Sequence, residues 1–361
     1  MNLTFKNDWE ETRERFRLWW KHDYFGRCAL AVTAPKDNPP DAPPAPPAKS
    51  PEQMWYDLDG CSLANQWQHS RTFWGGEAFP IWNAGYSGVS ALPHLLGCPI
   101  ELDLTTGWTT PILTDPDTID FRSVRLDENH PGYQFTMRML RRATLESRGK
   151  SIPCIGAFGG SGDTLAGLRG TEQLLLDCVE RPDEVTAAED YLMEMWCDFY
   201  DRCFALVRES AGGSTCWFPL WSPGKFYAVH NDFSYAIGPN MFRELFLSAI
   251  RRQTDFLDHS VYHVDGVEAF RHVDALCELP RLQAIQILPG AGKPSPLHYL
   301  ETLKKVQAAG KNLHITIAAE ELEPALRKLS ARGLFISTEA RSEEEARRLL
   351  QDAERWSVDR G

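Results

Sequence analysis

From residue 151 onward, short apolar runs alternate with amphipathic stretches of helical length. Six strand–helix pairs follow one another, with strands expected at 151–158, 214–221, 260–264, 284–288, 312–317 and 334–338. The helices between and after them are expected at 171–210 (two helices broken at Arg181-Pro182), 239–257, 267–278, 296–309, 321–332 and 342–354. Such alternation predicts a parallel sheet with helices outside it.

The first 150 residues are less regular, but they complete the predicted fold. Residues 28–34 read as a buried strand, and one more strand in this half brings the count to eight. We therefore expect an α/β protein, a (β/α)8 TIM barrel forming a single domain over 1–361; an open doubly wound sheet is the alternative. Residues 1–27 form an N-terminal helical extension. Residues 35–51 form a proline-rich surface loop that crosses the barrel rim.

The net charge and the cysteines limit which kinds of partner and which cellular compartment are expected. The 361 residues carry a formal charge of -12, which disfavours binding to nucleic acid or to an anionic membrane surface. The nine cysteines are scattered without a CxxC pair, as expected of free thiols in the cytoplasm. There is no membrane-length apolar run and no nucleotide-binding fingerprint. Small molecules and other proteins remain, and exposed aromatic residues in the N-terminal half suggest a homodimer.

Polar side chains gather where the predicted strands end, which is where barrel enzymes place their active sites. The candidates in chain order are Asp163, Trp217, Tyr227, His230, Asp232, His263, Asp265, Gln286 and Glu339. Among them, Asp163, Trp217, Tyr227, His230 and Gln286 are expected to bind substrate.

The most specific local feature is the sequence HVDG at 263–266. His263 and Asp265 are two residues apart on a strand, so their side chains point to the same face. They are predicted to be catalytic as an acid/base pair, or to bind a divalent metal such as zinc together with Glu339. The structural alternative is that Asp265 caps the next helix while His263 is a hydrogen-bonded core residue.

Two further carboxylates have similar alternatives. Asp232 precedes the helix expected from Pro239. It is either a catalytic group that orients the substrate or a turn residue. Asp163 follows three glycines, which permit close approach of a ligand, although it is also well placed to cap a helix.

Four stretches resemble the uroporphyrinogen decarboxylase superfamily, especially its corrinoid-linked methyltransferases and their uncharacterised relatives. They are GAFGGSGDTLAGLRGTEQLLLDCVERPDEV, NDFSYAIGPNMFRELFLSAI, YHVDG and GLFISTEARSEEEA, within roughly residues 140–355. The resemblance implies a (β/α)8 barrel with its site at the carboxyl ends of the strands.

The same resemblance shapes the chemistry we expect. The methyltransferases of that superfamily hold zinc with a His-x-Cys pair and a distant Cys. His263 matches the histidine, whereas Asp265 stands at the first cysteine and Glu339 or Ala340 near the second. This replaces thiolates by oxygen ligands. No arginine-rich segment like that of the decarboxylase follows residues 28–34, so decarboxylation of uroporphyrinogen is not expected.

Three functions follow as hypotheses. The first is a methyltransferase acting on a small molecule, exchanging methyl with cobalamin on a separate corrinoid protein. The second is a lyase or hydrolase that uses His263 and Asp265 as an acid/base pair. The third is a non-catalytic barrel that only binds a small molecule.

Overall fold

The computed structural model describes residues 2–85 and 87–361, and its main feature is a seven-stranded sheet. The strands lie in the order β2-β1-β11-β10-β9-β8-β7. Their bounds are β1 Ala29–Pro35, β2 Thr72–Gly76, β7 Phe226–Val229, β8 His259–Asp265, β9 Ala284–Leu288, β10 Asn312–Thr316 and β11 Leu334–Glu339. Every pair is parallel except β1 with β2. The expected mixed α/β class with a mostly parallel sheet is confirmed.

Shorter pairings lie outside this sheet. β3 (Ile81–Trp82) pairs in parallel with β6 (Ile152–Pro153), and Cys154 bridges to Thr215 in the same direction. β4 (Ile100–Leu102) and β5 (Gly107–Thr109) form an antiparallel hairpin. Among the described strands, hydrogen bonding leaves the large sheet open between its ends, β2 and β7.

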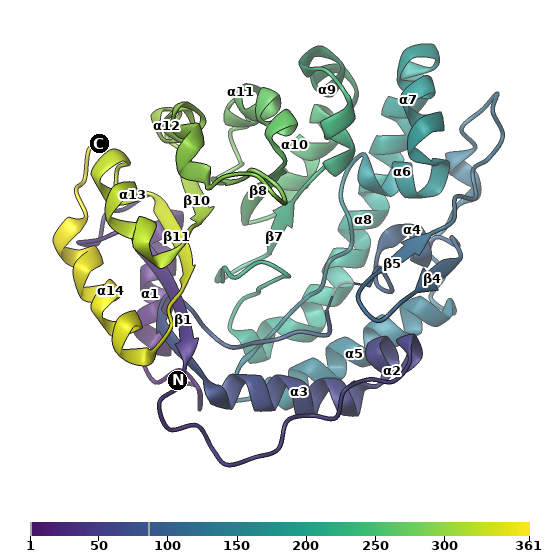
Figure 1. Cartoon of the computed structure of the whole chain (residues 1–361). Helices are drawn as coiled ribbons and strands as arrows, with labels where there is room; N and C mark the ends of the chain where they lie inside the picture. Colours follow the sequence, from purple (N-terminus) through teal and green to yellow (C-terminus); the bar gives the residue numbers. More distant parts are fainter. Residues whose placement is uncertain (1, 86) are drawn as a thin grey trace.

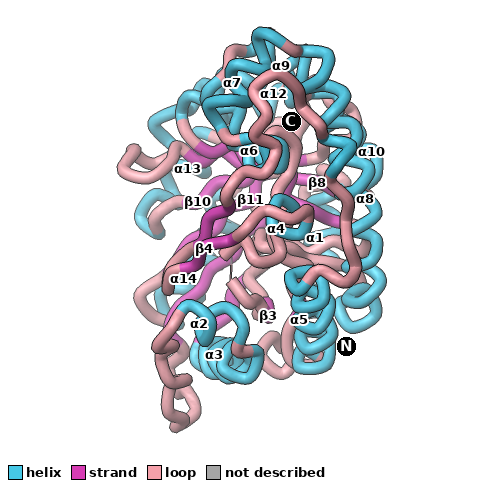
Figure 2. The backbone as a smooth tube through the Cα atoms, turned by 90° about the vertical axis from the view of Figure 1, so that its right-hand side faces the viewer, coloured by secondary structure: helices cyan, strands magenta, loops and turns pink. Residues whose placement is uncertain are grey.

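Helices cover the outside of the sheet. In Figure 1, strands β7 to β11 follow one another around an arc, and α9 to α14 lie on its outer side. Figure 2 shows the strands in the interior, with α8 and α10 along one side and α14 on the other. The α-helices are α1 Trp9–Trp20, α2 Pro51–Tyr56, α3 Leu58–Arg71, α4 Leu92–Leu95, α5 Pro131–Ser147, α6 Asp163–Arg169, α7 Thr171–Glu180, α8 Pro182–Ala211, α9 Pro239–Leu245, α10 Leu247–Phe256, α11 Val273–Cys277, α12 Leu300–Ala308, α13 Leu322–Lys328 and α14 Glu343–Trp356. The 3-10 turns are η1 Phe121–Ser123, η2 Asp232–Ala236, η3 Val267–His272, η4 Pro296–Tyr299 and η5 Ala319–Glu321.

Helix α1 closes the amino end of the sheet. Its Phe16 and Trp19 rings lie 5.9 and 5.5 Å from the ring of Phe335 at the start of β11. The indole N–H of Trp19 donates to the carbonyl of Gly333, and that of Trp20 donates to the carbonyl of Trp221. Because these large side chains are buried, the amino ends of the strands are sealed. A ligand site is therefore expected at the carboxyl ends of the strands.

One predicted strand is wrong and changes how the site is assembled. Residues 214–221 form only isolated bridges, at Ser214 and Thr215, and the strand of this unit is β7, at 226–229. The hydroxyl of Thr215 donates to the carbonyl of Leu220, and the N–H of Leu220 donates to the carbonyl of Phe218. These bonds fold the segment into a compact loop because the donors are spent locally instead of on a neighbouring strand.

Other boundaries differ in smaller ways. The helix expected at 239–257 is two helices, α9 and α10, separated at Phe246. The strand expected at 151–158 is regular only over Ile152–Pro153 before a glycine-rich loop begins. The helix expected at 321–332 ends at Lys328.

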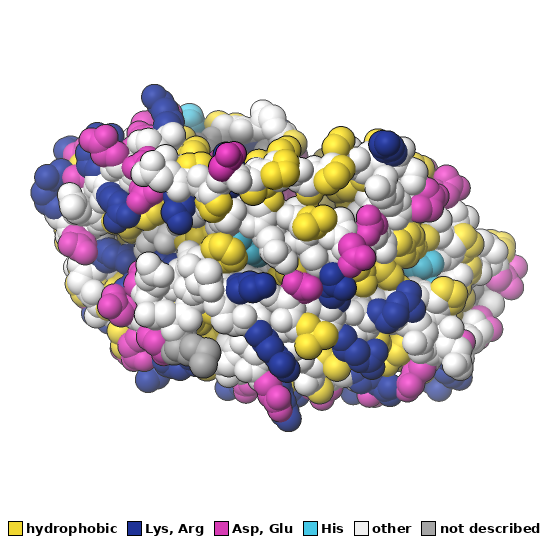
Figure 3. All heavy atoms as spheres, turned by 90° about the horizontal axis from the view of Figure 1, so that it is seen from below, with side chains coloured by type: hydrophobic (Ala, Val, Ile, Leu, Met, Phe, Trp, Pro, Cys, Tyr) yellow, Lys and Arg dark blue, Asp and Glu magenta, His cyan; other side chains and the backbone are white. Residues whose placement is uncertain are grey.

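On the face shown in Figure 3, acidic side chains do not gather into a patch. Basic and acidic side chains lie side by side there, with hydrophobic atoms between them. No helix in the described part of the chain is both long and apolar enough to cross a bilayer.

Candidate active site

The carboxyl ends of β7, β8 and β9 bring together the histidines predicted from the sequence. His263 of β8 is the register partner of Gln286 of β9, and its Nδ1 is hydrogen-bonded to the Oε1 of Gln286. Because an amide oxygen only accepts, the proton of a neutral His263 ring lies on Nδ1, and Nε2 is the basic nitrogen. Burial lowers the pKa of His263, and the nearby His230 acts in the same direction. These effects favour the neutral form of His263, in which Nε2 carries the lone pair that can accept a proton.

A second imidazole faces a carboxylate across the same region. His230 directly follows β7, and its Nδ1 lies 3.2 Å from the carbonyl of Ala228. Its Nε2 lies 3.5 Å from the Oδ2 of Asp163, the first residue of α6. The other oxygen of Asp163 accepts the N–H of Phe233 at 2.8 Å. Since Nδ1 donates to the carbonyl, the facing Nε2 and Oδ2 atoms require a proton between them.

The environment favours a proton on this pair. Burial raises the pKa of Asp163 to about 6, and the negative charge of Asp232 adds to that effect, whereas His230 opposes it. A carboxyl group with a pKa near 6 can take up and release a proton near neutral pH. Asp163 and His230 can therefore act together as an acid/base pair.

Trp217 joins the two histidines. Its ring stands edge-on to that of His230, with centroids 5.7 Å apart, and to that of His263, at 5.1 Å. The loop at 214–221 places it there from outside the strands. Trp217, His230, His263, Asp163 and Gln286 are named the His–Asp cluster below.

The remaining predicted residues have different surroundings. Asp232 is exposed at the start of η2, and Asp265 is half-buried at the end of β8, on the same face as His263. Tyr227, expected at the substrate, is fully buried, and its hydroxyl accepts the N–H of Phe158 at 2.7 Å. Its role is thus to hold the loop that follows β6.

Glu339 lies away from His263. It ends β11, and β10 and β9 separate that strand from β8. Three strand spacings along the curved sheet amount to about 14 Å, so the two residues do not meet as strand neighbours. Within residues 2–85 and 87–361, no group of three or more His, Cys, Asp or Glu side chains is arranged to hold a metal. The side chains present do not fit the expected zinc site.

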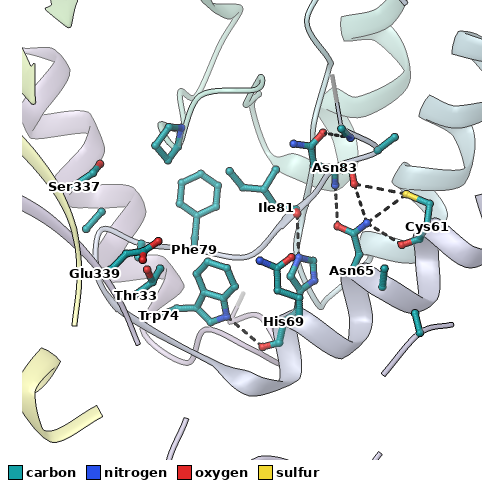
Figure 4. Close-up of a pocket in the computed structure, with 18 of the residues that line it drawn as sticks. Thr33, Cys61, Asn65, His69, Trp74, Phe79, Ile81, Asn83, Ser337 and Glu339 are labelled. Carbon is teal, nitrogen blue, oxygen red and sulfur yellow. Dashed lines mark hydrogen bonds between the residues drawn. The ribbon is translucent and has the colours of Figure 1, made fainter. Parts of the chain in front are cut away.

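Glu339 instead lines a large cavity that the sequence did not reveal. The cavity has a volume of about 1090 Å³. Figure 4 shows Thr33, Ser337 and Glu339 on one wall, Cys61 and Asn65 on the opposite wall, and Trp74, Phe79 and Ile81 between them. Residues 45–48 of the proline-rich loop also line it. A cavity of this size is that of a small-molecule site.

The cavity and the His–Asp cluster share a boundary. Cys216 and Pro219 line the cavity, while the two residues between them face the cluster. The ring of Phe218 lies 6.1 Å from that of His263 and 5.0 Å from that of His314. The loop at 214–221 therefore separates a ligand-sized space from the proton-accepting side chains.

Glu189 of α8 supports the cluster from behind and was also missed. Its Oε2 accepts the hydroxyl of Ser161 and the N–H of Gly162, the latter at 2.9 Å. Burial raises the pKa of Glu189 to about 8, so the carboxyl is protonated at neutral pH. It lies mid-helix in an amphipathic pattern, where only its burial, unusual for a glutamate, distinguishes it from a surface residue.

Comparisons with known proteins add a likeness in fold. The sequence matches no protein-family model, and no curated protein resembles it significantly in sequence. A solved structure, a methyltransferase from Methanosarcina mazei, does superpose. The TM-score is 0.62 at 10% identity, over 95% of this chain and 98% of that one. The chain shares the fold of that methyltransferase over nearly its whole length.

Proposed function

We propose that this chain is a methyltransferase-like enzyme of the uroporphyrinogen decarboxylase superfamily, acting on a small molecule at the mouth of a distorted (β/α)8 barrel. The carrying observation is the 1090 Å³ cavity beside the His–Asp cluster, in a chain that superposes on a methyltransferase. The sequence motifs of the superfamily support the same assignment.

The barrel is inferred from the order of the parallel strands. The series β1, β3, β6, β7, β8, β9, β10 and β11 gives eight strands in chain order. The parallel β3–β6 pair and the Cys154–Thr215 bridge lie between β1 and β7 in that order. They would occupy the gap left by the seven-stranded sheet, where short strands and glycine-rich loops distort the wall.

The chemistry assigned to the chain is removal of a proton. The substrate would extend from the cavity past the loop at 214–221. Its acceptor O–H, S–H or N–H would give its proton to Nε2 of His263, and the freed lone pair would attack the methyl carbon of the donor. The bond between the methyl group and the donor breaks, and its electron pair stays with the donor. Asp163 and His230 would receive the proton next. A corrinoid on a separate protein is the proposed donor, and no step is assigned to a metal on this chain.

Methylcobalamin offers a direct test. Purified protein is mixed with methylcobalamin and a panel of small thiols, amines and phenols, and product is measured by mass spectrometry together with loss of the donor's absorbance. We expect turnover that His263→Ala lowers about 100- to 10,000-fold. The control is His298→Ala, which alters an exposed histidine of η4. Equal rates in both variants would contradict the assignment of His263.

The facing pair Asp163 and His230 favours a second candidate, a lyase or hydrolase that uses acid/base catalysis on the same barrel. Such an enzyme would exchange an acidic C–H of its substrate with solvent. Incubation of small carboxylic acids with the protein in D₂O, followed by NMR, would detect that exchange. Exchange that Asp163→Asn abolishes, without any methyl transfer, would favour this candidate. A non-catalytic barrel would bind ligands and give neither signal.

A further inference from the structure

Three neighbouring strands place an acidic and an aromatic side chain on the same cavity wall. Thr33 of β1 is the register partner of both Glu339 of β11 and Trp74 of β2. Side chains in register point to one face of a sheet, and all three residues line the cavity. Figure 4 shows Glu339 and Thr33 beside Trp74, with Phe79 above Trp74 in this view.

The spacing of this row suits a positively charged group. Two strand spacings separate Glu339 from Trp74, which amounts to about 9–10 Å. A cation within about 6 Å of an indole centroid is attracted by the ring, and a carboxylate at about 4 Å adds a direct charge interaction. One substituted ammonium group between Glu339 and Trp74 would satisfy both distances.

The charges that line the cavity point the same way. The carboxylates are Asp57, Glu320, Glu339 and Glu345, and the single guanidinium is Arg341. Four negative and one positive side chain leave a net charge of -3. Glu345 accepts the backbone N–H of Arg341 and lies 3.8 Å from Arg348, so its charge is partly offset. Glu339 has no ion-pair partner among the residues that the structure describes.

The histidine in the cavity adds no positive charge. The Nε2 of His69 lies 2.9 Å from the carbonyl of Ile81, so it donates its proton there. Burial lowers the pKa of His69 to about 4, and the ring is neutral at physiological pH. Asn65 and Gln68 of α3 are uncharged amides.

We propose that the cavity binds an organic cation, its substituted ammonium group held between the carboxylate of Glu339 and the indole of Trp74. The volume exceeds that of a bare trimethylammonium group, so the rest of the ligand would lie toward the proline-rich loop and α3. This rests on the proposed function, of which it names the substrate class: a cationic small molecule whose ammonium group is held here and whose O–H, S–H or N–H accepts the methyl group.

Matched probes separate charge from shape. Isothermal titration calorimetry compares (3-hydroxyphenyl)trimethylammonium with 3-tert-butylphenol, which replaces the charged nitrogen by carbon. A third probe, 3-tert-butylbenzoate, carries a negative charge. We expect the cation to bind about tenfold more tightly than the phenol, and its advantage to shrink as salt is added. Equal binding of cation and phenol, preference for the benzoate, or binding of none of the probes would overturn the proposal.

Variants locate the binding determinants. Glu339→Gln should weaken the cation about fivefold or more and leave the phenol unchanged, while Trp74→Leu weakens the cation and Trp74→Phe retains it. Glu301→Gln, which alters an exposed carboxylate of α12, is the control. Thermal melts check that each variant folds. A cation affinity that Glu339→Gln leaves unchanged would refute the assigned residue.

Binding and turnover can fail separately. If the cation binds as expected but no methyl transfer is found with methylcobalamin, the site stands and its role in methyl transfer is rejected. If methyl transfer occurs with neutral acceptors while the cation does not bind, the proposed function stands and the cation site is rejected.

Discussion

Nε2 of His230 lies 3.5 Å from Oδ2 of Asp163, just beyond the carboxyl end of β7. Neither atom carries a proton when the ring is neutral with its proton on Nδ1 and the carboxyl is ionised. One added proton turns the pair from two facing acceptors into a hydrogen bond. The pair is therefore sensitive to pH in the range where enzymes work.

The pH dependence of the free energy of unfolding should reveal this sensitivity. Burial raises the pKa of Asp163 from 3.8 to about 6, so the folded chain holds this proton more tightly than the unfolded chain. Its contribution is fully present below about pH 4 and is lost as the pH rises through 6, by at most about 3 kcal/mol. Asp163→Asn, which keeps the acceptor for Phe233, should raise the melting temperature at pH 8 relative to wild type, but not at pH 4. An equal difference at both pH values would count against a protonated Asp163.

Glu189 offers a comparison at higher pH. Its pKa of about 8 means that it is neutral at pH 7, and a glutamine can accept the same bonds from Ser161 and Gly162. Glu189→Gln should match wild type in urea unfolding at pH 4, where the glutamate is protonated in both the folded and the unfolded chain. The Gln variant should become more stable than wild type as the pH rises from about 4.5 to 8, because only the folded chain holds the proton in that range. Glu189→Ala should cost about 2–4 kcal/mol at pH 4 because it leaves donors unpaired and a void. A difference between the Gln variant and wild type that is the same at pH 4 and pH 8 would show that the folded chain does not hold this proton.

A buried ion pair should matter more than any surface pair. The two terminal guanidinium nitrogens of Arg27 donate to Glu77, at 2.7 and 2.8 Å, and Glu77 is fully buried. Burial would raise the pKa of Glu77, but Arg27 outweighs it and the pKa falls to about 2. Glu77→Gln should cost about 3–5 kcal/mol at pH 7, since it leaves the buried Arg27 unpaired.

The pH dependence of that cost checks its origin. Stability from an ionised Glu77 is fully present above about pH 4.5 and is lost as the pH falls toward 2. The difference between wild type and Glu77→Gln in urea unfolding should therefore shrink between pH 5 and pH 3. A constant difference would point to lost packing instead of lost charge.

Removal of metal tests the predicted zinc site, whose ligands the structure does not bring together. We expect activity to survive dialysis against a chelator, because the described residues bring no three ligands together. Elemental analysis of wild type and His263→Ala, both purified without chelator, accompanies the assay. Stoichiometric zinc in wild type that is absent from His263→Ala would show that ligands assemble in a way the geometry does not suggest.

The cluster could be predicted because strand ends of a parallel sheet meet at one edge. The sequence predicts His230 and Asp232 just after a strand, and in the structure that strand is β7 instead of 214–221. The run at 214–221 is richer in aromatic residues than Phe226–Val229, and periodicity cannot tell a buried loop from a buried strand over so few residues.

Glu339 and the cavity depended on distances that a sequence does not contain. The prediction joined Glu339 to His263 because both end strands, but three strand spacings separate them. The cavity is bounded by α3 and by residues 45–48, and nothing in their local pattern shows that they fold back against β1 and β11. Glu339 was thus predicted as a functional residue, and the structure gives it different neighbours.

The pairing of β1 with β11 also limits how early in synthesis the chain can fold. Residues 29–33 find their parallel partners at 335–339, about 300 positions later. A ribosome must therefore release most of the chain before β1 gains its parallel neighbour, and until then β1 can pair only with β2. The aromatic side chains of α1 likewise cannot pack on Phe335 until β11 has been made. Closing so distant a contact costs chain entropy in advance of any gain from burial. We expect slow folding, in which the N-terminal segment is the part that most needs protection from aggregation during synthesis.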